Sequence, residues 1–143
     1  MPYPIQPIAI TASTTLNRNT HAGTLVNLSA AAGLTVTLPA STGKGDMYRL
    51  FVLTTVTSNS DIIKVANSTD VIQGAIDIAA AGGVAGVTAG TATTSDTITM
   101  NGTTTGGIIG SYIELTDASL GFWLLSGCLI ASGTVVTPFS ATV

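Results

Sequence analysis

Charged side chains are scarce in this sequence. They make up 8% of the 143 residues, against about 25% in an ordinary globular domain. The net charge is −3, and the basic residues stand far apart, at Arg18, Lys44, Arg49 and Lys64. Because a protein that binds nucleic acid needs a basic patch to neutralise successive phosphates, we expect no nucleic-acid partner.

Cysteine and histidine each occur only once. Cys128 lies in the apolar run FWLLSGCLIAS and cannot form an internal disulfide, so we expect a small buried hydrophobic residue there. His21 lies in the polar connection NRNTHAGT, with no acidic cluster beside it in sequence, so we expect a structural or merely exposed residue. This supply of ligands predicts no metal site and no cofactor.

The sequence also lacks the usual patterns of catalytic residues. A phosphate-binding loop is not matched at GKGD, because a glycine follows Lys44 and Leu38 stands where the first glycine would fall, and no G-x-S-x-G elbow is present. A carboxylate pair for glycoside hydrolysis could still assemble in the fold. We nevertheless expect no catalytic residues and no enzyme, because the acidic residues are spread singly, at Asp46, Asp61, Asp70, Asp77, Asp96, Glu114 and Asp117.

Long apolar runs are missing as well. The window from Ala75 to Gly90 is interrupted by Asp77 and by glycines and is shorter than the roughly 18 residues of a membrane span. The start, MPYPIQPIAI, has no basic residue and does not fit a secretory signal peptide. We expect neither membrane insertion nor export through the Sec pathway.

What the sequence does contain is typical of an all-β protein. Hydrophobic residues make up 45%, which excludes a disordered chain, and Thr, Ser, Val and Ile dominate without a helical period. We expect one core and a single sandwich, jelly-roll-like fold or small barrel. The predicted strands are Thr24 to Leu28, Leu34 to Leu38, Tyr48 to Val56, Ile62 to Val65, Asp70 to Ile78, Ser95 to Met100, Ile108 to Thr116 and Gly121 to Ile130.

Two turn signals refine this prediction. Asn101-Gly102 suits a tight hairpin, which the following Thr and Gly residues would lengthen, and Pro39 should end the strand before it.

In the predicted strand from Leu34 to Leu38, Leu34, Val36 and Leu38 would point inward while the threonines between them, Thr35 and Thr37, point outward. We expect this uncharged outer face to lie at or near a subunit contact, or to be exposed on a particle.

Two segments fall outside the strand pattern. Residues 1–10 alternate proline with apolar residues and predict an extended arm, ahead of a β-rich domain over residues 11–143. The arm residues expected to contact a neighbouring protein are Pro2, Tyr3, Pro4, Ile5, Pro7 and Ile8. Ala79 to Gly90 is predicted to be an apolar loop that lies against a neighbour or at a symmetry axis.

A β protein with uncharged faces and few lysines needs its edges and faces covered to avoid aggregation. Coverage by other copies is the simplest solution, and closed symmetry makes a ring the expected form. The sequence therefore predicts a homo-oligomer.

A resemblance to a known family adds to this prediction. The segments ITASTTLNRNTHAGTLVNLSAAAGLTVTLPASTGKGDMYRLFV, SDIIKVANSTDVIQG, SDTITMNGTTTGGIIGSYIELTD and GFWLLSGCLIASGTVVTPFSAT resemble the head decoration, or capsid cement, proteins of tailed bacteriophages. The resemblance covers the chain from about residue 10 to the end. It implies synthesis in the host cytoplasm, trimers on local threefold axes outside the head, the major capsid protein as partner and no enzymatic activity.

Two alternatives remain at this point. The first is a trimeric fibre or spike module for host-surface recognition, which would present aromatic or polar residues at a distal tip, whereas aromatic residues are only 5% here. The second is a small β-sandwich hydrolase or lectin, which would need clustered carboxylates or calcium-ligand spacing.

Overall fold

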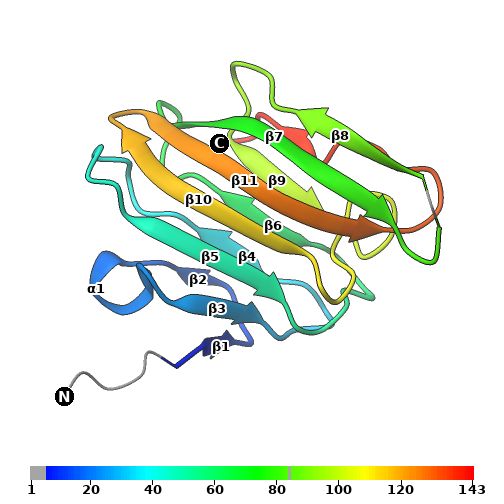
Figure 1. Ribbon diagram of the computed structural model, residues 1–143. Coiled ribbons are helices and arrows are strands. Elements are labelled where there is room, and N and C mark those ends of the chain that lie inside the picture. The colour runs from blue at the N-terminus through cyan, green and yellow to red at the C-terminus, as the bar shows by residue number, and fades with distance from the viewer. Residues whose placement is uncertain (1–5, 84) are drawn as a thin grey trace.

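Two β-sheets pack face to face in the computed structural model, which describes residues 6–83 and 85–143 (Figure 1). The strands are β1 (Ile8–Ile10), β2 (Thr14–Thr15), β3 (Leu25–Leu28), β4 (Thr35–Thr37), β5 (Met47–Val52), β6 (Asp61–Lys64), β7 (Val71–Ala80), β8 (Gly86–Gly90), β9 (Thr97–Met100), β10 (Tyr112–Ser119), β11 (Phe122–Ala131) and β12 (Phe139–Ser140). A single helical turn, α1 (Arg18–His21), is capped at its N-terminus by Asn17, whose side chain accepts a hydrogen bond from the Thr20 N–H.

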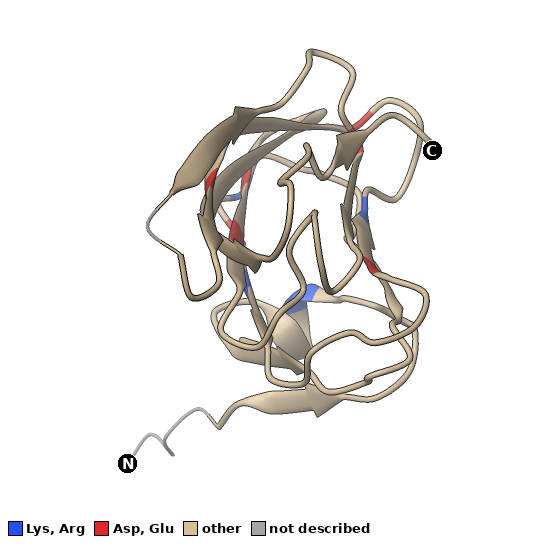
Figure 2. Cartoon of the chain, turned by 90° about the vertical axis from the view of Figure 1, so that its right-hand side faces the viewer, with Lys and Arg blue, Asp and Glu red and all other residues tan. Residues whose placement is uncertain are grey.

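Both sheets mix parallel and antiparallel pairs. The larger sheet has seven strands in the order β1-β3-β5-β10-β11-β7-β8, and the smaller has five in the order β12-β9-β6-β4-β2. The side view shows the two layers and how few charged residues they carry (Figure 2). The expected all-β sandwich is therefore confirmed, and each of the eight predicted strands overlaps an observed one. Strands β1, β2, β8 and β12 were not predicted, because they are short or rich in glycine and alanine.

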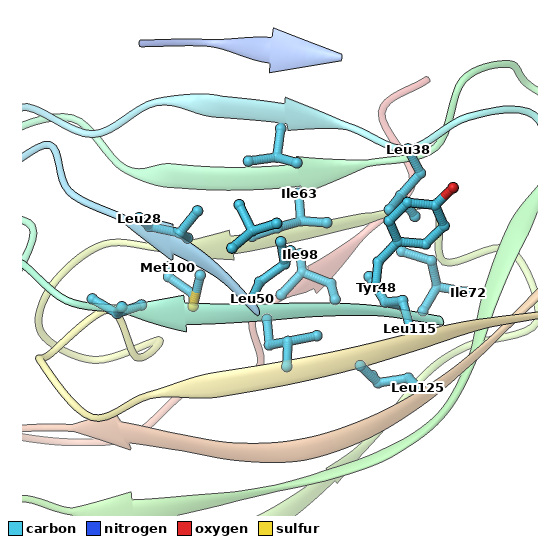
Figure 3. Packing of buried hydrophobic residues seen from close by; sticks show 14 of the residues in the cluster. Leu28, Leu38, Tyr48, Leu50, Ile63, Ile72, Ile98, Met100, Leu115 and Leu125 are labelled. Carbon is cyan, nitrogen blue, oxygen red and sulfur yellow. The ribbon is translucent and has the colours of Figure 1, made fainter. Parts of the chain in front are cut away.

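The core lies between the sheets and follows from alternation along the strands. Leu34, Val36 and Leu38 are buried while Thr35 and Thr37 are half-buried on the outer side, as predicted. Large side chains from both sheets interdigitate in this core (Figure 3). Burial of each large apolar side chain stabilises the fold by about 1.5–3 kcal/mol.

The segment from Ala79 to Gly90 is a hairpin rather than the predicted apolar loop. Strand β7 continues to Ala80, and β8 pairs with it antiparallel, with Ile78 opposite Val87. The prediction was wrong because alanine and glycine carry little strand signal, while the ladder of β7 supplies hydrogen bonds that any backbone can make. As the end of the larger sheet, β8 leaves one edge without a partner strand among the described residues.

Asn101-Gly102 does not form the predicted tight hairpin, because β9 and β10 belong to different sheets. Only Gly102 of this pair has a positive φ, of 78°. The Asn101 side-chain oxygen accepts hydrogen bonds from the N–H groups of Thr103 and Thr105 and so orders a crossover loop. Pro39 does follow the end of β4, as expected.

The predicted arm is described only at its end. Pro2, Tyr3, Pro4 and Ile5 lie outside the described residues. Pro7 is exposed, and Ile8 begins β1, which pairs parallel to β3 with Ile8 opposite Val26. Residues 8–10 thus belong to the larger sheet, and Ile10 is buried in the core. Among the described residues no helix is long and apolar enough to cross a membrane.

Candidate interaction surface

Apolar side chains gather on the outer side of the larger sheet. Along β3, β5, β10 and β11 the residues that alternate with the core residues point away from the smaller sheet. We call this set the outer apolar face: Leu25, Phe51, Tyr112, Phe122 and Leu124. Tyr112, Phe122 and Leu124 are each 50–54% exposed. Since isolated exposed hydrophobic residues are normal, the concentration on one sheet is the informative feature.

The register makes this surface continuous across the strands. Phe51 lies opposite Tyr112, and Tyr112 lies opposite Cys128. Leu124 lies opposite Thr116 two rows further along, beyond the row that contains Glu114. Cross-strand neighbours have Cβ atoms about 4.5–5.5 Å apart, so these side chains contact one another along the rows.

The main charges in the middle of this face compensate each other. Arg49 Nε lies 2.7 Å from a Glu114 carboxylate oxygen, and the two residues are register partners on β5 and β10. The side chains are 58% and 29% exposed, so this pair adds little to stability. It does leave the surface without net charge at that point, which removes the usual electrostatic barrier to contact between two copies.

The outer side of the smaller sheet is different, because it is built largely of threonine. Thr35 lies opposite Ile62, which lies opposite Thr99, and Thr37 lies between Thr15 and Lys64. We call this the threonine face. Threonine has a high strand propensity and a hydroxyl that can find a hydrogen bond in a contact, so the face tolerates either water or a neighbour.

The buried carboxylates are engaged in hydrogen bonds within the fold. Asp70 accepts from the Ser41 N–H at 2.8 Å and from its hydroxyl at 3.0 Å. Asp96 accepts from the N–H groups of Thr142 and Val143, and so fixes the C-terminal end of the chain. These contacts hold distant segments together.

Asp117 fills the position that an anion would take in the GKGD loop. Its carboxylate accepts hydrogen bonds from the N–H groups of Thr42, Gly43 and Lys44 and from the Thr42 hydroxyl. Burial raises the pKa of Asp117, but these hydrogen bonds outweigh burial and hold the pKa below its usual value. The loop amides bind this side chain, in agreement with the failed match to a phosphate-binding loop.

The single histidine and the single cysteine lie on different elements, α1 and β11. His21 is buried, and its Nδ1 lies 3.1 Å from the Asn17 N–H, so its role is structural. Cys128 is only half-buried and lies on the outer side of β11, which corrects the prediction of a buried residue. Among the described residues no three His, Cys, Asp or Glu side chains come together as a metal site would require.

Comparison with family models, with curated proteins and with solved structures gives no match.

Sequence reasoning did not select the outer apolar face, although the signal was present. Phe122, Leu124 and Trp123 are adjacent apolar residues, and a strand must place Trp123 on the face opposite its neighbours. The structure buries Trp123, which is 1% exposed, against Tyr48 with the ring centroids 5.7 Å apart. Trp123 is thus buried in the core, and its two neighbours are exposed.

Proposed function

We propose that this protein is a structural protein of a phage particle, which binds the outside of the capsid as a homotrimer and cements neighbouring capsid subunits. The observation that carries the proposal is the outer apolar face, which carries no net charge at its centre, where Arg49 pairs with Glu114, and which spans four strands. A surface of this kind is stabilised when a protein covers it. In our proposal, copies of the chain meet through this face in the trimer, and the resemblance to decoration proteins supplies the capsid as the second partner.

A trimer suits a capsid junction for a simple physical reason. Once one subunit is bound, the other two meet their sites at high effective concentration, so that weak single contacts give strong binding overall. The uncharged surface also makes binding insensitive to salt, since few ion pairs would be screened.

The segment before β1 contributes to this binding in our proposal. Its prolines restrict the unbound chain and lower the entropy lost on docking, while Tyr3 and Ile5 supply apolar area. Because β1 begins at Ile8, deletion of residues 2–7 removes the segment and leaves the sheet intact.

The test is to add the purified protein to undecorated heads of the phage that encodes it and, separately, to host cells. We expect stoichiometric binding to heads, imaged at sites of threefold symmetry, and no binding to cells. Deletion of residues 2–7 should lower the occupancy of the heads. Binding to cells without binding to heads would overturn the proposal and favour the fibre or spike module, and unchanged occupancy after the deletion would exclude the role of the segment.

A further inference from the structure

Strand β8 forms an open edge of the larger sheet, beyond β7 (Figure 1). Its sequence is GVTAG, and all five residues pair with β7 without a bulge. Natural proteins usually protect an edge strand from other chains with lysine, proline or a bulge. Because β8 has none of these, its edge is a template on which another strand can pair.

The pairing with β7 determines which backbone groups of β8 face the open edge. The Gly74 carbonyl of β7 accepts a hydrogen bond of 2.9 Å from the Thr91 N–H, directly after β8. Because the bonded pairs of an antiparallel ladder alternate along the strands, Ala89 and Val87 also turn their backbone groups to β7. The residues whose N–H and carbonyl groups face the open edge are Gly86, Thr88 and Gly90.

The core side of β8 is also partly uncovered. Val87 lies opposite Ile78, which is 1% exposed, so both side chains point to the core side of the sheet. Val87 is nevertheless 49% exposed, and a groove of about 290 Å³ lies between it and residues 133–135. A strand added at the open edge would place a side chain beside Val87 and cover it.

The sequence of β8 suits pairing with a second copy of itself. In either direction, GVTAG has glycine at both ends, threonine in the middle and a small apolar residue on each side of the threonine. An antiparallel arrangement about a twofold axis at Thr88 places this residue opposite its own copy. The other pairs are then Gly86 with Gly90 and Val87 with Ala89. The three open-edge residues of each copy form about six hydrogen bonds in this arrangement, and a cross-strand pair of threonines is favourable.

We propose that β8 pairs antiparallel with β8 of a second copy across a twofold axis, so that two of the larger sheets join into one. This contact is the same on both copies and closes after two of them, which avoids open fibres. Pairing with β1, the other end of the sheet, would be heterologous and would offer only three residues, directly after Pro7. This inference does not depend on the proposed function.

The contact is weak by itself because it is small. An edge of five residues buries less than the roughly 1,000 Å² of a stable interface, so we expect a Kd of about 0.1–1 mM. It is therefore distinct from a contact through the outer apolar face, which should already form at micromolar concentration.

The test is ¹⁵N NMR of the full-length protein at concentrations from about 20 µM to about 1 mM, which bracket the expected Kd. The amides of Gly86, Thr88 and Gly90 should become protected from hydrogen exchange as the concentration rises. Those of Val87 and Ala89, which are bonded to β7, should be protected throughout. A mixture of ¹³C-labelled and unlabelled protein should show an intermolecular NOE between the Hα atoms of Val87 and Ala89, which form the close, non-bonded pair. No dependence on concentration, or protection without this NOE, would overturn the proposal.

Substitutions of Thr88 test the pairing directly. Thr88→Pro removes the central N–H of the open edge without breaking a bond to β7, and it should weaken association by at least about tenfold. Thr88→Val is the matched control and should associate as the wild type does. It also loses the hydroxyl that donates to Asp77 at 2.6 Å, but it keeps the backbone N–H. Weakening by Thr88→Val as strong as that by Thr88→Pro would overturn the proposal.

A second variant covers the case in which proline disturbs the fold, which loss of protection at Val87 and Ala89 would reveal. Thr88→Lys keeps the backbone N–H but places two like charges opposite each other across the axis. It should weaken association at low salt, and association equal to that of the wild type would overturn the proposal.

Discussion

At the scale of single residues, Asp61 is the carboxylate least satisfied by the fold. It is fully buried, and its Oδ1 accepts one hydrogen bond from the Leu34 N–H at 3.1 Å, while Oδ2 has no partner among the described residues. Burial raises the pKa of Asp61 to about 6 from an ordinary value of 3.8, against the smaller opposing effect of the Leu34 hydrogen bond.

The pH dependence of stability follows from this shift. Between pH 4 and 6 the folded state binds more protons than the unfolded state, so the contribution of Asp61 to the unfolding free energy falls as pH rises through this window. The contribution is fully present below about pH 4 and lost above about pH 6, and it amounts to about 3 kcal/mol.

We therefore predict that Asp61→Asn, which cannot ionise, gains stability relative to the wild type as pH rises. The difference in unfolding free energy between the two proteins should grow by up to about 3 kcal/mol from pH 4 to pH 7. Urea unfolding at several pH values measures it. Asp77→Asn, which changes an exposed carboxylate on β7, is the control. A constant difference across this range would show that Asp61 does not titrate there.

At the scale of elements, the loops are held by specific devices, and the clearest is the contact of Asp117 with the GKGD loop. Four donors from Thr42, Gly43 and Lys44 converge on this side chain. Removal of the carboxylate would leave several partly buried N–H groups without an acceptor at once, which is more costly than the loss of one ordinary hydrogen bond.

Asp117→Ala should lower the unfolding free energy by about 3 kcal/mol at pH 7. Glu114→Gln on the same strand is the matched control, and because it breaks only an exposed ion pair it should cost less than about 1 kcal/mol. Since the pKa of Asp117 is lowered, its contribution is present above about pH 4 and is lost as pH falls further, so the two proteins should converge in acid. Equal losses in the two variants at pH 7 would contradict this account.

The crossover loop after β9 needs glycine for two reasons. Gly102 has a φ of 78°, and a Cβ built there would overlap the Val56 carbonyl oxygen. Gly45 has a similar φ of 77°, but nothing lies within 4 Å of the corresponding position. Alanine substitutions at Gly45 and Gly102 therefore distinguish the cost of backbone strain alone from the cost of strain together with steric overlap.

We predict that Gly45→Ala lowers the unfolding free energy by about 1–2 kcal/mol, the cost of a left-handed conformation for alanine. Gly102→Ala should lose at least about 2 kcal/mol more, because the backbone near Val56 must also move. Chemical denaturation of the two variants gives both numbers. A similar loss in both would mean that the crossover loop adjusts freely.

At the scale of the whole molecule, lysine substitutions test which of the two outer faces lies in a contact between copies. On the outer apolar face, Tyr112→Lys with Leu124→Lys places charge where we propose that copies meet. On the threonine face, Thr35→Lys with Thr37→Lys places the same charge on a surface that tolerates either water or a neighbour.

We expect the wild type to sediment as a trimer at micromolar concentration and the Tyr112→Lys, Leu124→Lys variant to dissociate. Both proteins should still unfold cooperatively, which shows that the variant is folded. Unchanged assembly of the threonine-face variant would place that face toward solvent, and dissociation would place it in a second contact. A wild type that is monomeric at this concentration would remove the main physical argument for an oligomer.

The fold class was predictable because local chemistry determines it. Alternation of Leu34, Val36 and Leu38 with threonine allows only one face of that strand to be buried, and the same logic located eight strands. The hairpin of β7 and β8 was not predictable in this way, because its alanines and glycines have no strong preference until a neighbouring strand offers hydrogen bonds.

By itself, the sequence determined that the chain is all-β, with little charge and with threonine on an outer face, whereas the choice of a sandwich over a small barrel came from the tertiary structure. Only the tertiary structure decided which strands neighbour each other, and therefore that Phe51, Tyr112 and Leu124 share one surface. It also decided that the GKGD loop binds Asp117, 74 residues from Gly43 in the chain. Local periodicity orients each side chain relative to its own strand, but strand order and register depend on contacts between distant segments, which no local pattern specifies.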